Sequence, residues 1–197
     1  MRGGCGNDSL AGGTDEDRRD GGAGAEVLSG GGGRDVLKGG TGNDLLNGGD
    51  DKDKLYGGAG DDRINGDRGS DYINASSGND VIFGGDGRDK ILMGAGADAA
   101  TGGAESDWFV FNSEVLDGQI NTIFDFTRDA GQADRLDFRS LSLVSDAQEF
   151  ETWLTLNVAQ QGADVQISFD GFALTLIDHN DLGSTFYDQV LDGIQLI

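Results

Sequence analysis

The chain has 197 residues, of which 36 are glycine, 36 are acidic and 14 are basic, so its formal net charge is −22. This charge makes nucleic acids and anionic membranes poor partners. With one cysteine and no apolar run of membrane-spanning length, the sequence excludes a disulfide framework, a thiolate metal cluster and a transmembrane helix. No apolar signal-peptide segment follows the N-terminal Met-Arg-Gly, so we expect any export to use another route.

A repeat of nine residues runs without insertion from Gly3 to Val110. Its first, second and fourth positions are mostly glycine, and its eighth position is apolar in every unit except at Arg19. The sixth position is always acidic: Asp8, Asp17, Glu26, Asp35, Asp44, Asp53, Asp62, Asp71, Asp80, Asp89, Asp98 and Asp107. Because several independent positions keep one register, we predict an ordered solenoid rather than a disordered acidic tract.

Each repeat is interpreted as a six-residue glycine-rich loop followed by a three-residue strand with one side chain pointing inward. Such units stack as parallel coils. One buried aliphatic side chain per nine residues makes a small core, and stacked aspartates repel one another. A divalent cation would remedy both problems. Carboxylate and carbonyl oxygens suit calcium better than magnesium, which keeps several waters, or zinc, which prefers nitrogen and sulfur ligands.

The units GGTGNDLLN (39–47) and GGAGDDRIN (57–65) resemble the RTX nonapeptide of secreted bacterial toxins, metalloproteases, lipases and alginate epimerases. The resemblance implies an all-β fold, a right-handed parallel β-roll over residues 1–110 with two nonapeptides per turn. It also implies roughly six to eight calcium ions, each held between the loops of units two apart, such as those of Asp35 and Asp53. Unit 12–20, which has Asp15 and Arg19 at its fourth and eighth positions, is expected to be a frayed or metal-poor coil.

The resemblance further implies which residues hold the metal. The implied carboxylate ligands are Asp8, Asp35, Asp44, Asp53, Asp62, Asp71, Asp80, Asp89, Asp98 and Asp107. The implied carbonyl ligands include the loop glycines Gly31, Gly33, Gly40, Gly42, Gly58, Gly60, Gly85 and Gly87.

Residues 111–197 lose the repeat and are richer in aromatic and β-branched residues. Their pattern predicts strands over 108–111, 121–126 and 134–138, a short helix over 145–156, a hairpin about Asp170-Gly171 and a final strand over 192–197. The stretch 123–138 resembles the segment after the repeats in serralysin-type metalloproteases and alginate epimerases. That resemblance implies a small, mainly β capping domain with one short helix, and a type I secretion signal near 180–197.

Three carboxylates of this segment, Asp125, Asp134 and Asp137, have two interpretations. They could hold one more calcium ion, or they could be solvated side chains at strand ends. Catalysis is not expected. His179 is the sole histidine and no Gly-x-Ser-x-Gly elbow accompanies it, while the regular spacing of the repeat carboxylates indicates an array of equivalent ligands rather than one catalytic pair.

The seventh and ninth positions of the even-numbered units should share one outer face. They include Lys38, Lys54, Tyr56, Tyr72 and Lys90. Such a ladder could bind an acidic polysaccharide such as alginate, or its lysines could simply keep an exposed sheet soluble. The resemblance favours a secreted, non-catalytic module that binds calcium, folds after type I secretion and stabilises an exported bacterial protein. The alternative is a polysaccharide-binding module of a carbohydrate-active enzyme or adhesin.

Overall fold

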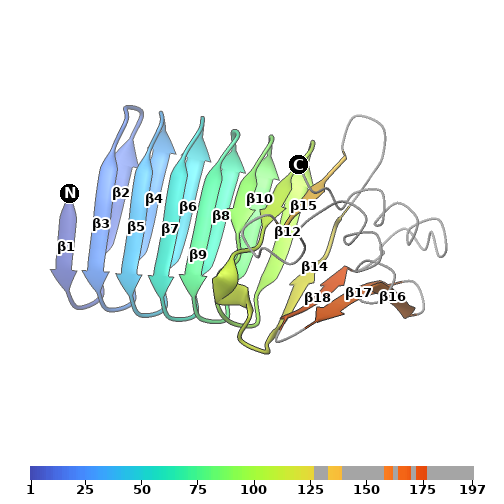
Figure 1. Cartoon of the computed structure of the whole chain (residues 1–197). Coiled ribbons are helices and arrows are strands. Elements are labelled where there is room, and N and C mark those ends of the chain that lie inside the picture. The colour runs from blue at the N-terminus through green and yellow to red at the C-terminus, as the bar shows by residue number, and fades with distance from the viewer. Residues whose placement is uncertain (127–132, 139–157, 162–163, 170–171, 177–197) are drawn as a thin grey trace.

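The computed structural model describes residues 1–126, 133–138, 158–161, 164–169 and 172–176. Two sheets are stacked along the repeats, and the chain passes from one to the other after every strand of the repeats (Figure 1). In the described residues the one helical element is a short 3₁₀ turn, η1 (Ser113–Val115). The all-β parallel roll expected from the repeat is confirmed.

One sheet has eight strands and is called sheet A. In spatial order they are β1 (Arg2–Cys5), β3 (Arg18–Ala23), β5 (Val36–Thr41), β7 (Lys54–Ala59), β9 (Tyr72–Ser77), β11 (Lys90–Leu92), β13 (Trp108–Val110) and β15 (Arg135–Asp137). The other has ten strands and is called sheet B. They are β2 (Ser9–Gly13), β4 (Val27–Gly32), β6 (Leu45–Asp50), β8 (Arg63–Arg68), β10 (Val81–Asp86), β12 (Ala99–Ala104), β14 (Ile120–Ile123), β18 (Phe172–Leu176), β17 (Asp164–Phe169) and β16 (Val158–Gln161).

Neighbouring repeat strands pair in parallel with equivalent residues opposite each other. Lys54 of β7 faces Tyr72 of β9, and Arg63 of β8 faces Val81 of β10. Each pair is separated by two nonapeptides in the sequence. Two repeats therefore make one turn of the roll, as the resemblance implies.

The interior is filled by the eighth position of each repeat. Its members are completely or almost completely buried: Leu10, Leu28, Leu37, Leu46, Leu55, Ile64, Ile73, Ile82, Ile91, Ala100 and Phe109. The two sheets thus bury one row of side chains each and share one core. Since the period of side-chain direction in a strand is two residues, the seventh and ninth positions point outward.

The strands are longer than the sequence predicts. Most span six residues rather than three, because the first three positions of the next unit continue the ladder; Gly40 of β5, for example, pairs with Gly58 of β7. The turn that remains contains only the fourth to sixth positions. The prediction is wrong because it equates glycine with loop, whereas here glycine lets consecutive turns approach closely while they are still hydrogen-bonded.

Unit 12–20 is not frayed. Its strand β3 pairs in register with β1 on one side and β5 on the other, for example Arg19 with Leu37. Only 8% of the Arg19 side chain is exposed, and its guanidinium forms an ion pair with Asp17 at 3.0 Å. A buried cation is tolerated here because an anion lies directly beside it.

Both sheets continue past the repeats. β14 pairs with β12 in sheet B, and β15 pairs with β13 in sheet A, so the predicted strands over 121–126 and 134–138 are confirmed in shortened form. The predicted hairpin is confirmed by the antiparallel pairing of β17 with β18, from Val165–Leu176 to Phe169–Phe172. The division into two domains at 110/111 stays a prediction. Within the described ranges, no helix has the length and apolar character needed to cross a membrane.

Candidate metal centres

The sixth-position carboxylates form two ladders, one along each row of turns. The backbone N–H of Asp44 donates to Oδ1 of Asp62 at 2.8 Å, and that of Asp53 donates to Oδ1 of Asp71 at 2.7 Å, in each case across 18 residues. The same bond recurs from Asp17, Glu26, Asp35, Asp62, Asp71, Asp80 and Asp89. One ladder therefore contains Asp17, Asp35, Asp53, Asp71, Asp89 and Asp107, and the other contains Glu26, Asp44, Asp62, Asp80 and Asp98. These are the carboxylate ladders.

The second oxygen of each carboxylate has a different environment. Among the described residues, Oδ2 is buried and has no hydrogen-bond partner in Asp8, Asp35, Asp44, Asp53, Asp62, Asp71, Asp80, Asp89, Asp98 and Asp107. The Asp53 and Asp107 side chains are 0% exposed. Buried polar atoms in folded proteins almost always have a partner, so a repeated row of partnerless oxygens indicates that a ligand belongs there.

Where the first position of the unit is Gly30, Gly39, Gly48, Gly57, Gly66 or Gly84, a backbone carbonyl oxygen and Oδ2 lie beside the same glycine. A Cβ atom placed on Gly48 would lie 2.6 Å from Oδ2 of Asp53 and 2.7 Å from the carbonyl oxygen of Gly66 in the next turn. The same pair of oxygens surrounds the first-position glycines Gly30, Gly39, Gly57, Gly66 and Gly84. Carboxylate and carbonyl oxygens are the donors that calcium prefers. The residues therefore fit a calcium ion.

Carboxylates alone do not make a complete site. In the part of the chain that the structure describes, no group of three or more acidic, histidine or cysteine side chains could hold a metal together. Calcium takes six to eight oxygens, so backbone carbonyls or water must supply the rest of the ligand set. Sequence reasoning missed the first-position glycines as part of this environment, because it attributed the carbonyl ligands to the second and fourth positions.

The glycines predicted as carbonyl ligands line the turns. All eight, from Gly31 to Gly87, have φ between +95° and +128°, which confirms the expected left-handed backbone. Each faces the backbone of the residue 18 positions earlier; a Cβ on Gly60 would lie 2.6 Å from the carbonyl carbon of Gly42. A side chain here would clash with the previous turn. Whether these carbonyls bind the ion stays a prediction.

Burial raises the pKa of the ladder carboxyls. The pKa of Asp53, Asp62 and Asp89 rises from 3.8 to about 6, because the charged form loses water; the N–H donor of the previous turn opposes this rise. The pKa rises to about 7 for Asp71 and Asp98 and to about 8 for Asp80 and Asp107. Burial is the largest cause, and nearby carboxylates add to it in every case. Without a bound cation, ionisation of these carboxyls therefore destabilises the folded roll.

Two residues beyond the repeats extend the ladders, and sequence reasoning missed one of them, Asn121. Oδ1 of Asn121 accepts from the N–H of Asp98 at 3.1 Å, and Oδ1 of Asp134 accepts from that of Asp107 at 2.9 Å. A signal was present: both are followed two residues later by a buried aliphatic, Ile123 and Leu136, as in the repeats.

The first interpretation of Asp125, Asp134 and Asp137, one shared calcium site, is not supported, because the described residues contain no group of three or more such side chains that could hold a metal. Asp125 instead accepts from the N–H groups of Gly102 and Gly103 at 2.8 and 2.7 Å. Asp134 and Asp137 are buried, with 2% and 9% exposure, so they are not solvated either. Their first interpretation required one cluster and the second required exposure to water, and neither is found.

The outer face of sheet A carries the predicted basic and aromatic residues side by side. Tyr56 and Tyr72 have ring centroids 5.8 Å apart, and Lys38 Nζ lies 5.8 Å from the Tyr56 ring centroid. Lys54 and Lys90 flank Tyr72 in the register of the sheet and are exposed. These five residues are called the Lys/Tyr stripe.

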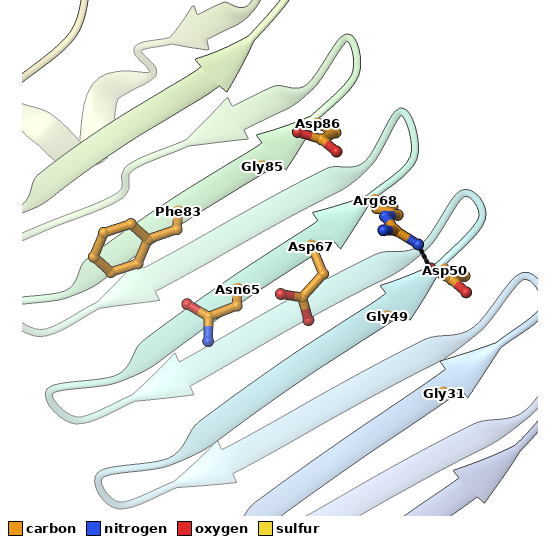
Figure 2. A pocket seen from close by; sticks show the side chains of 9 residues that line it. All are labelled: Gly31, Gly49, Asp50, Asn65, Asp67, Arg68, Phe83, Gly85 and Asp86. Carbon is orange, nitrogen blue, oxygen red and sulfur yellow. Dashed lines mark hydrogen bonds and ion pairs between the residues drawn. The ribbon is translucent and has the colours of Figure 1, made fainter.

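The outer face of sheet B has a different character. Figure 2 shows a hollow over β4, β6, β8 and β10 that is lined by Asn65, Asp67, Phe83 and Asp86, among others. Its one arginine, Arg68, pairs with Asp50 at 3.4 Å. Acidic groups exceed basic ones in this hollow, whereas the Lys/Tyr stripe contains three lysines and no carboxylate. The predicted secretion signal, the helix over 145–156, the final strand and His179 lie outside the described residues.

The repeats of this chain match a known protein family. The family described as the RTX calcium-binding nonapeptide repeat (4 copies) matches residues 2–37, 20–55, 38–73, 56–91 and 65–100. The AlgE6R3 subunit of the Azotobacter vinelandii mannuronan C5-epimerase is 26% identical over 75% of this chain and 80% of its own, with a TM-score of 0.33. The extracellular lipase LipA of Serratia marcescens is 15% identical over 98% of this chain and 38% of its own, with a TM-score of 0.24. No curated protein matches.

The family assignment depends on the repeats and not on these two distant folds. The matched segments together run from residue 2 to residue 100, which is half of the chain. They contain the greater part of the carboxylate ladders and the glycine turns described above. The chain therefore belongs to the family of RTX calcium-binding nonapeptide repeat proteins.

Proposed function

We propose that this chain is a module whose folding depends on calcium bound along its carboxylate ladders. The observation that carries this proposal is the row of buried Oδ2 atoms without a hydrogen-bond partner among the described residues; those of Asp35, Asp44, Asp53, Asp62, Asp71 and Asp89 share the environment of a first-position glycine with a carbonyl oxygen of the next turn. A structural role alone would not require a second oxygen to be buried in so many repeats. The first oxygen already satisfies the N–H of the previous turn.

The residues that would hold one ion can be named for the central turn. Oδ2 of Asp53 and the carbonyl oxygen of Gly66 both lie next to Gly48. Asp71, one turn further, approaches the same turn through its bond to the N–H of Asp53. When bound, calcium supplies positive charge that neutralises stacked carboxylates and links consecutive turns. The predicted number, roughly six to eight ions, remains part of this proposal.

Coupling of binding to folding follows from charge. The chain carries a net charge of −22, and the metal-free roll raises the pKa of its ladder carboxyls. Both effects favour the unfolded chain at neutral pH, where these groups can ionise in water. The free energy of metal binding then becomes free energy of folding.

This behaviour suits an exported protein. Calcium is scarce inside cells, so the chain would remain unfolded and exportable there and would fold outside. We infer secretion by the type I route, with the signal near 180–197, and a non-catalytic role in stabilising the protein to which the module belongs. Support for this inference comes from the family and from the charge of the chain.

The test compares the chain in EDTA with the chain in millimolar calcium. Circular dichroism and sedimentation velocity should report an expanded, weakly structured chain in EDTA and a compact β-rich one in calcium. Magnesium at the same concentration is the control and should not restore the fold, because it prefers a rigid octahedral shell. An equally compact, β-rich form in EDTA would refute the proposal.

A second candidate function is the binding of an acidic polysaccharide by the Lys/Tyr stripe. Its support is the continuous run of Lys38, Tyr56, Tyr72 and the flanking lysines on a chain that is otherwise strongly acidic. Neighbouring aromatic rings and repeated ammonium groups can contact a linear anionic sugar chain along the roll. Titration with oligo-alginate at low salt tests this function, and an absence of binding would remove it.

A further inference from the structure

Arg19 is the only charged residue at the eighth position of a repeat. Elsewhere in sheet A this position is filled by Leu37, Leu55 or other apolar side chains, all facing the core. The Arg19 side chain also points into the core, since only 8% of it is exposed. Its Nη2 lies 3.0 Å from Oδ2 of Asp17, the sixth-position acid of the same unit.

The oxygen that Arg19 contacts is the one that lacks a partner in other repeats. A Cβ on Gly12 would lie 2.8 Å from Oδ2 of Asp17, much as a Cβ on Gly48 would lie 2.6 Å from Oδ2 of Asp53. The two oxygens thus occupy equivalent places in their turns. Among the described residues, Oδ2 of Asp53 is buried without a partner, whereas Oδ2 of Asp17 is paired with a guanidinium.

We propose that Arg19 is a built-in counter-ion that replaces calcium in the turn of unit 12–20, so that this turn binds no metal. This inference rests on the proposed calcium-binding function. A guanidinium stays protonated at any ordinary pH, so it supplies its positive charge permanently. A divalent cation beside it would meet like charge in a site of low dielectric constant. The first turn of this ladder is therefore neutralised in the absence of calcium.

The proposal predicts that removing the guanidinium creates a metal site. Arg19→Leu restores the residue type of the other repeats and frees Oδ2 of Asp17. Native mass spectrometry of the full chain in saturating calcium counts bound ions directly. Arg19→Leu should bind one ion more than the unsubstituted chain. The matched control is Arg18→Leu, which changes the net charge equally at an exposed neighbouring position and should leave the count unchanged.

A second pair of variants keeps the test decisive if Arg19→Leu does not fold. Asp17→Asn should leave the ion count unchanged, because no ion is bound there to lose, whereas Asp53→Asn should lower it. An unchanged count in folded Arg19→Leu, or a loss in Asp17→Asn equal to that in Asp53→Asn, overturns the role of Arg19. If the unsubstituted chain binds no calcium, or Asp53→Asn loses none, the proposed function fails instead.

Discussion

The backbone N–H of Asp71 donates to Oδ1 of Asp89 at 2.8 Å, while Oδ2 of Asp89 is buried without a partner among the described residues. From Asp35 to Asp107 in one ladder and from Asp44 to Asp98 in the other, the two oxygens of each carboxylate thus have different roles. One satisfies a peptide group of the previous turn, and the other is left for a cation. Substitutions that remove the charge but keep the acceptor can separate these two roles.

Replacing Asp71 by Asn should weaken calcium binding without opening the turn. The amide oxygen can still accept from the N–H of Asp53, but the charged ligand oxygen is lost. We expect the calcium concentration at half-folding, measured by circular dichroism, to rise by at least about tenfold. Asp61→Asn is the control, because Asp61 is exposed and its oxygen also accepts a backbone N–H across 18 residues, that of Asn79 in the next turn. Equal midpoints for the two variants would contradict the assignment.

The metal-free chain should fold better in mild acid than at neutral pH. The folded-state pKa of the ladder carboxyls is raised from 3.8 to about 6 for Asp53 and about 8 for Asp80, so the folded state binds more protons between these values. This stability is fully present below pH 3.8 and is lost as the pH rises from there through the folded-state pKa values of about 6 to 8. Chemical denaturation in EDTA at about pH 5 and about pH 7.5, two values within this interval, measures the difference. A metal-free roll that is more stable at the higher pH would show that folding does not raise the pKa of these carboxyls.

Gly48→Ala should be strongly destabilising. Its Cβ would lie 2.6 Å from Oδ2 of Asp53 and 2.7 Å from the carbonyl oxygen of Gly66, so either the turn or the carboxylate must move. We expect a loss of about 2 kcal/mol or more in the unfolding free energy in calcium. Gly13→Ala is the matched control, because a Cβ there meets nothing within 4 Å. Similar denaturation midpoints would mean that the close approach at Gly48 is not required.

Asn121→Asp should make the C-terminal end of its ladder dependent on calcium. Oδ1 of Asn121 accepts from the N–H of Asp98, which fixes the orientation of the amide group. Nδ2 of Asn121 therefore occupies the place that Oδ2 has in other turns. It is buried and has no hydrogen-bond partner among the described residues. A carboxylate at this place adds a buried negative charge. We expect lower stability than the unsubstituted chain in EDTA, and recovery of most of the difference in calcium. Asn7→Asp, at an exposed position whose oxygen also accepts a backbone N–H, should show neither effect.

The Lys/Tyr stripe predicts which face an acidic polysaccharide would contact. The double substitution of Lys54 and Lys90 by Ala removes two exposed charges that flank Tyr72 on sheet A. We expect affinity for oligo-alginate at low salt to fall by about tenfold, as measured by calorimetry. Arg63→Ala removes a basic residue from sheet B, where its guanidinium lies over Phe83, and should have little effect. An equal loss from both faces would indicate nonspecific attraction.

The repeat makes most of this fold predictable. The strict spacing of Leu46, Leu55 and Ile64 predicts the inward row, and the acidic sixth position predicts where the carboxylates gather. The strand length could not be predicted from propensity. Gly40 and its equivalents belong to the sheet because only glycine permits the close approach of the next turn, a property of stacked coils that a single unit does not reveal.

The segment after the repeats is less predictable, because its side chains make contacts that do not follow the spacing of the repeat. Asn121 and Asp134 continue the ladders although the glycine pattern has ended, and Asp125 bonds to the backbone of the turn before it. The charge of Arg19 alone predicts a defect in its repeat. Its pairing with Asp17 depends on both side chains reaching one interior point, which spacing in the sequence does not specify.

The bond from each ladder N–H to the carboxylate one turn later always runs in the same direction. The two ends of each ladder therefore differ. The C-terminal end needs acceptors for its backbone N–H groups, and the N-terminal end has carboxylate oxygens that could accept further N–H groups. Any segment docked beyond Asp107 must offer oxygens, as Asn121 and Asp134 do, whereas a further coil stacked before Asp17 would have to offer N–H groups. Modules of this kind could be joined end to end only in one orientation.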